Sequence, residues 1–353
     1  MAAKTAFETQ LEKYNEAQWA QAISDLLPEI HEVDRNATQI WFRFYPLALF
    51  QYLQTAEDQE TARKKFVMQG TYDLKDQIDG SHKFFYGHAY WKQVKDAISA
   101  RVDSFDSKGG ENLDLVSEIK HAAKDATVTT GADVSVLLGI TAAGLMTLRQ
   151  AGAEAFKAAP GQININRAHL KKTPEQILAA RAKDDSQGLF GFLRTVDKQW
   201  TVNYDETDPG ARFKLMNDEE IASAAAKDQS KNWVELDPRC PEGPIPVECR
   251  SASCGTCWVG VIGGAEKLSD VAERERKQLK VFGYSSDEQN KPLIRLACQA
   301  RATGAVSVVI PPWNAVFGKK VYNNVADVEL EPNTTTAKNN RNVVREAVKN
   351  KLM

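Results

Sequence analysis

Four cysteines constrain the fold of this chain more than any other feature. Cys249, Cys254 and Cys257 form a C-x4-C-x2-C run, and Cys298 follows after a gap of forty residues. Two irons bridged by two sulfides need four thiolates, and this spacing is typical of plant-type [2Fe–2S] clusters. The small residues between the first three cysteines leave room for backbone N–H groups to approach the cluster sulfurs. The sequence therefore predicts a [2Fe–2S] cluster bound by these four cysteines.

Other uses of these cysteines fit the pattern less well. A structural zinc site more often has two short C-x-x-C pairs, whereas the run contains only one. Disulfides fit badly, because three cysteines lie within nine residues and the total of five is odd. The fifth, Cys240, precedes the run by nine residues, and we interpret it as a structural cysteine rather than a ligand.

The residues around the cysteines resemble [2Fe–2S] ferredoxins of the plant and adrenodoxin superfamily. Residues 248–257 are similar to the plant-type cluster loop, with Ala252 where plant proteins usually have glycine. Residues 266–279 and 295–299 are similar to the bacterial and adrenodoxin-like branch. The resemblance covers about residues 191–317, although the loop before the run and the gap before the fourth cysteine are longer than usual. It implies a β-grasp domain that takes up and donates single electrons.

The residue pattern by itself predicts a compact, β-rich order in the same region. An Asp-Pro-Gly turn at 208–210 favours a hairpin between the strands on either side of it. Asn217, three residues before Glu220, is a capping-box-like helix start. The expected elements are strands at 200–204 and 211–215, a helix at 217–225, a strand at 258–262, a charged helix at 270–281 and a strand at 305–310.

The first 185 residues are predicted to be mostly helical, because apolar residues recur there at helical spacing. Thr173 to Gln176 form a capping box with proline at the first helical position, which opens a helix that fades near Lys183. Residues 134–148 lack charges but are too few to span a bilayer, so they are expected to form a buried helix. The other expected helical segments lie at 7–27, 40–53, 90–102, 113–123 and 132–158, with a loop at 104–111.

The predicted fold class is therefore α+β, in three parts. A helical domain covers residues 1–185, a ferredoxin-like domain covers 186–318, and a polar tail covers 319–353. The boundary is placed in the polar segment 184–188.

The helical domain shows only scattered candidates for ligands. His82 and His88 lie six residues apart among aromatic residues, and we expect them to be partly buried near a loop. Glu118 and His121 form a single Glu-x-x-His motif, whereas a carboxylate-bridged di-iron bundle needs two. We expect this motif to lie on a solvated helix face. Neither a dinucleotide fingerprint nor a P-loop motif is found in the sequence.

These patterns favour an electron carrier, or an electron-transfer subunit of an oxidoreductase system, over an enzyme. It would exchange electrons with redox protein partners, and its helical domain would serve docking or assembly. The alternative is a redox enzyme whose helical domain is catalytic or binds a second cofactor. Aromatic residues at 41–45 and 84–91 suit a core or an interface, and an exposed patch of them would favour a homo-oligomer or a larger complex.

Charge, cysteine use and the start of the sequence limit which other partners and which cellular compartment we expect. A net charge of −2 and a pI near 6.3 give no electrostatic reason to expect a nucleic acid. The sequence start lacks the apolar core of a secretory signal, and no membrane span is expected. Cysteines committed to a cluster suit a reducing compartment, so a cytoplasmic location is expected.

Overall fold

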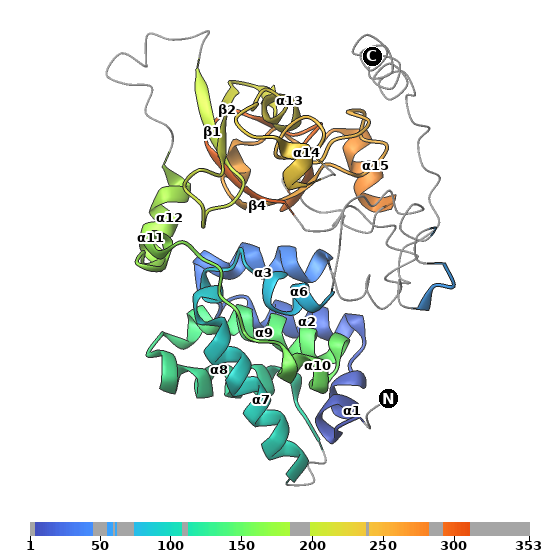
Figure 1. The fold of residues 1–353 in the computed structure, drawn as a ribbon, viewed down its shortest axis with the longest axis vertical. Coiled ribbons are helices and arrows are strands. Elements are labelled where there is room, and N and C mark those ends of the chain that lie inside the picture. Colours follow the sequence, from blue (N-terminus) through green and yellow to red (C-terminus); the bar gives the residue numbers. More distant parts are fainter. Residues whose placement is uncertain are drawn as a thin grey trace. The chain divides into compact units, whose positions relative to one another are not determined.

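The computed structural model describes residues 4–44, 55–58, 61, 74–107, 112–183, 198–237, 240–281 and 292–310. These residues belong to two compact units, which are described separately (Figure 1). A helical unit contains most of the described residues up to Ala180, and a unit with a mixed β-sheet contains most of those from Arg181 onward. The boundary predicted at 184–188 and the tail predicted at 319–353 lie outside the described residues.

Helix α9 (Val134–Ala151) is the central element of the helical unit, and α3, α7, α8 and α10 pack against it. Gly144 permits one close approach, because a Cβ there would lie 2.7 Å from Ile98 Cδ1 and 3.1 Å from the ring of Trp91. By length and composition alone α9 could cross a membrane, but 72% of it is buried inside the unit. Its burial agrees with the expectation from sequence. The helices whose bounds lie within the described residues before 183 are α1 (Ala6–Glu12), α2 (Glu16–Leu26), α3 (Glu32–Phe44), α6 (Leu74–Gly80), η1 (Tyr86–Tyr90), α7 (Trp91–Ser107), α8 (Leu115–Thr130), α9, α10 (Ala153–Ala158), α11 (Arg167–Leu170) and α12 (Pro174–Ala182).

Caps divide two segments that the sequence pattern predicts as continuous. The pattern at 7–27 forms α1 and α2, because Asn15 and Gln18 make a reciprocal capping box that starts a second helix. The pattern at 132–158 is broken at Gly152, whose φ of 86° ends α9. The capping box at Thr173 is confirmed, since Gln176 N donates to Thr173 Oγ1 and Thr173 N to Gln176 Oε1. The expected loop at 104–111 begins later, since α7 continues to Ser107.

The second unit is built on a five-stranded sheet in the order β2-β1-β7-β4-β5. Strands β1 (Gln199–Asn203) and β2 (Arg212–Met216) form the expected antiparallel hairpin. Strand β7 (Val306–Val309) pairs parallel to β1 and antiparallel to β4 (Trp258–Gly263), which pairs antiparallel to β5 (Ile294–Leu296). Strand β4 is buried on both faces, and along β2 buried and exposed residues alternate. A separate two-stranded sheet joins β3 (Glu219–Glu220) to β6 (Arg301–Ala302).

In the described residues, the sheet is accompanied by the helices α13 (Ile221–Ala225), α14 (Trp233–Leu236) and α15 (Glu273–Val281) and by the 3-10 helix η3 (Ala265–Lys267). The predicted capping box at Asn217 is wrong. Asn217 Oδ1 accepts from Trp200 Nε1, Asp218 adopts a left-handed φ of 62°, and β3 pairs with β6, so the helix starts at Ile221. Helix α15 starts three residues later than expected, because the backbone N–H of Ser269 donates to the carbonyl of Arg301 and keeps that segment extended.

Candidate metal centre

The segment 249–257 forms a tight loop between α14 and β4. Arg250, Ala252 and Gly255 in this loop adopt left-handed φ values of 55°, 60° and 65°. Alternation of right-handed and left-handed residues turns successive backbone N–H groups toward one side and creates an anion-binding concavity, as at many iron–sulfur sites. Left-handed φ at a residue with a Cβ costs about 1–2 kcal/mol. The left-handed φ values at Arg250 and Ala252 accompany hydrogen bonds from the loop backbone to the sulfur of Cys249.

Backbone donors of this loop converge on the sulfur of Cys249. The N–H groups of Ser251, Ser253 and Cys254 donate to Cys249 Sγ at 3.4, 3.3 and 3.3 Å. Three such donors stabilise negative charge on a buried sulfur. The loop thus prepares a thiolate and not a neutral thiol at this position.

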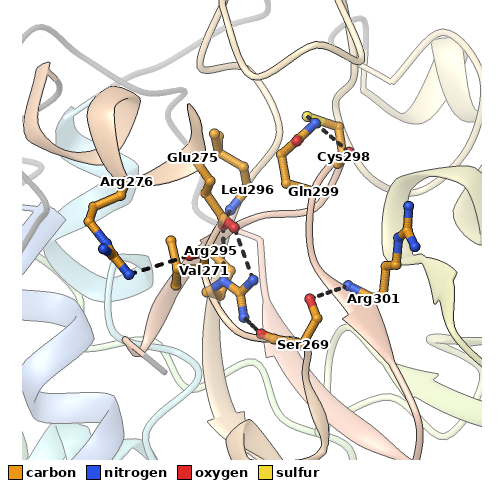
Figure 2. Close-up of polar contacts among 9 residues, drawn as sticks. All are labelled: Ser269, Val271, Glu275, Arg276, Arg295, Leu296, Cys298, Gln299 and Arg301. Carbon is orange, nitrogen blue, oxygen red and sulfur yellow. Dashed lines mark hydrogen bonds and ion pairs between the residues drawn. The ribbon is translucent and has the colours of Figure 1, made fainter. Parts of the chain in front are cut away.

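The fourth cysteine reaches the same site from the turn after β5. Cys298 is buried, and the backbone N–H of Ala297 donates to the carbonyl of Cys257 at 2.9 Å, which ties the turn to the end of the loop. Gln299 Nε2 donates to Cys298 O at 2.8 Å and lies 3.5 Å from Cys298 Sγ (Figure 2). The structure therefore brings the four sulfurs together as two pairs, Cys249 with Cys254 and Cys257 with Cys298.

The four sulfurs are arranged as two contacting pairs. Hydrogen bonding from the Cys254 thiol lowers the pKa of Cys249 to about 4, against the opposing effect of burial, and the same contact raises the pKa of Cys254. In the second pair, the contact between Cys257 and Cys298 raises the pKa of Cys257 and lowers that of Cys298. Within each pair one proton is shared between two contacting sulfurs, so the two thiols titrate as a unit, and metal binding requires both to be deprotonated.

This donor set fits a [2Fe–2S] cluster. All four sulfurs are buried, and two sulfur pairs match two irons that each take two thiolates. Within the described residues, no three His, Cys, Asp or Glu side chains are grouped so that they could hold one metal ion. All five cysteines lie in the described part of the chain, and none forms a disulfide.

Fold and site together define an iron–sulfur domain in the C-terminal part of the chain. Residues 218–303 match the family model of the 2Fe–2S iron–sulfur cluster binding domain. This part of the chain is therefore a ferredoxin-like [2Fe–2S] domain, its cofactor is a [2Fe–2S] cluster, and its role is iron–sulfur electron transfer. No solved structure matches the chain.

Arg250 is a residue of the site that the sequence analysis missed. Its guanidinium donates to Ser223 Oγ of α13 at 3.2 Å and forms an ion pair with Glu242. These two contacts attach the cluster loop to the elements that precede it. The partners lie 27 and 8 residues away in the chain, so no local pattern reveals them.

Cys240 is buried in the described segment before the cluster loop, and its Sγ lies 3.5 Å from the carbonyl oxygen of Pro244. Its interpretation as a structural cysteine remains a prediction.

Thr256 offers a test of how the loop tunes the cluster. Its Oγ1 lies 3.1 Å from Cys254 Sγ. A hydroxyl that donates to a thiolate stabilises the extra negative charge of the reduced cluster, so Thr256→Val should lower the reduction potential. We expect a shift of some tens of millivolts, within the roughly 59 mV that corresponds to a tenfold change for one electron. Thr256→Ser keeps the hydroxyl and is the control; equal potentials for the two variants in an EPR-monitored titration would contradict this role.

His82 and His88 in the helical unit are fully buried, not partly buried as expected. Their Nδ1 atoms lie 3.1 Å apart, between α6 and α7, and the ring of His82 packs on Trp91 at 4.1 Å. Burial lowers the pKa of His88 to about 4 and lowers that of His82 well below its usual value. Both rings are therefore neutral at pH 7, and one donates its Nδ1 hydrogen to the other.

The expectation of a solvated Glu-x-x-His face is wrong for the glutamate. Glu118 is buried and accepts two hydrogen bonds of 2.7 Å from Arg101, an arginine 17 residues earlier on α7. His121 is exposed as expected. The carboxylate is thus used to pair α7 with α8.

Proposed function

We propose that this protein is a one-electron carrier, or an electron-transfer subunit, in which Cys249, Cys254, Cys257 and Cys298 bind the cluster. The observation that supports this most is that the four sulfurs are buried and form two contacting pairs within the matched domain. The cluster supplies the ability to take up and release a single electron. The chain itself encloses the sulfurs, directs backbone N–H groups at them and limits the access of water.

The helical unit, in this proposal, serves docking or assembly and does no chemistry. His82 and His88 are engaged in a buried His–His contact and Glu118 in an ion pair with Arg101, and no three described His, Cys, Asp or Glu side chains are grouped as a ligand set. Large aromatic side chains such as Trp41 and Trp91 fill its core. Val128 is 86% exposed near the turn between α8 and α9, and Val134 is 39% exposed at the start of α9. Single exposed apolar side chains of this kind are common on protein surfaces, so they do not identify the partner.

Five cysteines without a disulfide also suit a reducing compartment, and we propose a cytoplasmic location on that ground.

A reductive titration of the whole chain tests the proposed function. Addition of dithionite to the anaerobic protein should bleach the visible absorption after uptake of about one electron per chain, because one [2Fe–2S] cluster accepts one electron. The alternative, a helical unit with its own cofactor, predicts a second chromophore and at least two electrons per chain. An uptake of two electrons, with a spectrum that loses one component when His82 or His88 is replaced, would favour that alternative.

A further inference from the structure

A fully buried ion pair lies beside the turn that presents Cys298 (Figure 2). Glu275 belongs to α15 and Arg295 to β5, and both side chains are 0% exposed. Arg295 Nε donates to Glu275 Oε1 and Nη2 to Oε2, each at 2.9 Å, so that the pair is bidentate. Removing two charges from water is costly, and a buried pair is tolerated only where its geometry and its additional hydrogen bonds are good.

The additional hydrogen bonds connect the pair to the backbone of Leu296, two residues before Cys298, and to the backbone of Ser269. Glu275 Oε1 also accepts from the N–H of Leu296 at 2.8 Å, and Arg295 Nη1 donates to the carbonyl of Ser269 at 2.8 Å. Ser269 Oγ in turn accepts from the N–H of Arg301 at 3.2 Å. The network therefore fixes the chain on both sides of Cys298, at Leu296 and at Arg301.

We propose that Glu275 and Arg295 are positioning residues for Cys298, an inference that rests on the proposed function in which Cys298 binds the cluster. Leu296 lies two residues before Cys298, so that a rotation of its peptide group moves the sulfur. The ion pair fixes that peptide group with a charged acceptor, which is stronger than a neutral one. Partners that orient a metal ligand in this way commonly change metal affinity about 10- to 100-fold when they are replaced.

The pair also carries one positive and one negative charge beside the cluster site, which becomes more negative when it accepts an electron. Glu275→Gln removes the negative partner and leaves the Arg295 cation buried without its counter-charge. That cation favours the reduced form, so the reduction potential should rise. The experiment therefore has two readouts, the potential for charge and the rate of iron release to a chelator for positioning.

The test compares three variants of the whole, cluster-loaded chain with the wild type. Glu275→Gln should raise the potential and speed iron release by about 10- to 100-fold. Glu273→Gln is the matched control, because it removes the same charge from the same helix. The Glu273 side chain is 84% exposed, and its Oε1 lies 3.6 Å from Lys277 Nζ. The control variant should change neither readout, since water and salt screen an exposed charge.

A double variant separates positioning from charge and from stability. Glu275→Gln with Arg295→Met buries no unpaired charge, so the potential should return toward the wild-type value and the thermal stability should recover in part. Iron release should stay fast, because Leu296 N no longer has a carboxylate acceptor and Ser269 O no longer has a charged donor. If Glu275→Gln alone does not fold, the iron release of the double variant still decides the question.

Two outcomes would overturn the inference. In the first, Glu275→Gln has the potential and iron-release rate of Glu273→Gln while only its melting temperature falls. In the second, iron release returns to the wild-type rate in the double variant, which would make the pair a stabilising element and nothing more. Failure of the proposed function gives a different result, namely a wild-type chain without iron and sulfide, or an unchanged spectrum in Cys298→Ser.

Discussion

Replacement of Cys298 by serine should abolish the stable [2Fe–2S] cluster. Cys298 is buried, and its sulfur contacts that of Cys257. The backbone N–H of the neighbouring Ala297 donates a hydrogen bond to the carbonyl of Cys257. A serine oxygen at this position is a harder and less acidic ligand than a thiolate, and the shorter side chain does not reach the same point. We expect loss or a strong change of the visible absorption, with iron content well below that of the wild type. The same result is expected for Cys249→Ser, Cys254→Ser and Cys257→Ser.

Cys240→Ser is the matched control for these variants. It makes the same chemical change at a cysteine that is also buried in the same unit. The variant should keep its iron, its sulfide and its spectrum, with at most a modest loss of stability. If Cys240→Ser lost the cluster while one of the other four variants kept the wild-type spectrum, the proposed ligand set would be wrong.

Gly243→Ala should strongly destabilise the ferredoxin-like unit. A Cβ at Gly243 would lie 2.2 Å from the carbonyl oxygen and 2.6 Å from the carbonyl carbon of Ala225, the last residue of α13. Backbone atoms cannot yield as a flexible side chain can, so α13 and the segment before the cluster loop must separate. Overpacking of this kind costs about 1–3 kcal/mol. Thermal unfolding monitored by the cluster absorption should show a clearly lower transition temperature and a lower iron content.

Gly80→Ala serves as the control for this prediction. A Cβ at Gly80 meets no atom within 4 Å, so the substitution should leave the transition monitored by cluster absorption unchanged. A Gly243→Ala protein with wild-type stability and full iron content would show that α13 and the loop are not packed as described.

The [2Fe–2S] cofactor could be predicted from the sequence largely because such a cluster is bound by one residue type, cysteine, at a characteristic spacing. Three of the four cysteines lie in one short loop, and a cluster accepts few other ligands. The hairpin β1–β2 could be predicted for a similar reason, since an Asp-Pro-Gly turn and alternating strands are local signals. Burial of α9 could also be predicted, because most of the helix lacks charged residues.

The residues that position the site were not visible in the sequence, because their partners are distant or of an unexpected kind. Glu275 lies in a helix whose many charges suggest a solvated face, yet it is fully buried against Arg295, 20 residues later. Glu118 was misjudged for the same reason. Charged side chains are rarely buried unless paired, and a single sequence does not say which of them will find a partner. The helix start at Ile221 was misplaced because pairing of β3 with β6, a long-range contact, overrides a local capping signal.

The most direct measurement for the central claim is the metal and sulfide content of the anaerobically purified chain, combined with EPR. The account predicts about two irons and two acid-labile sulfides per chain, a red-brown colour, and a rhombic EPR signal that is present only after reduction. One zinc per chain, with no visible absorption and no EPR signal after reduction, would contradict it.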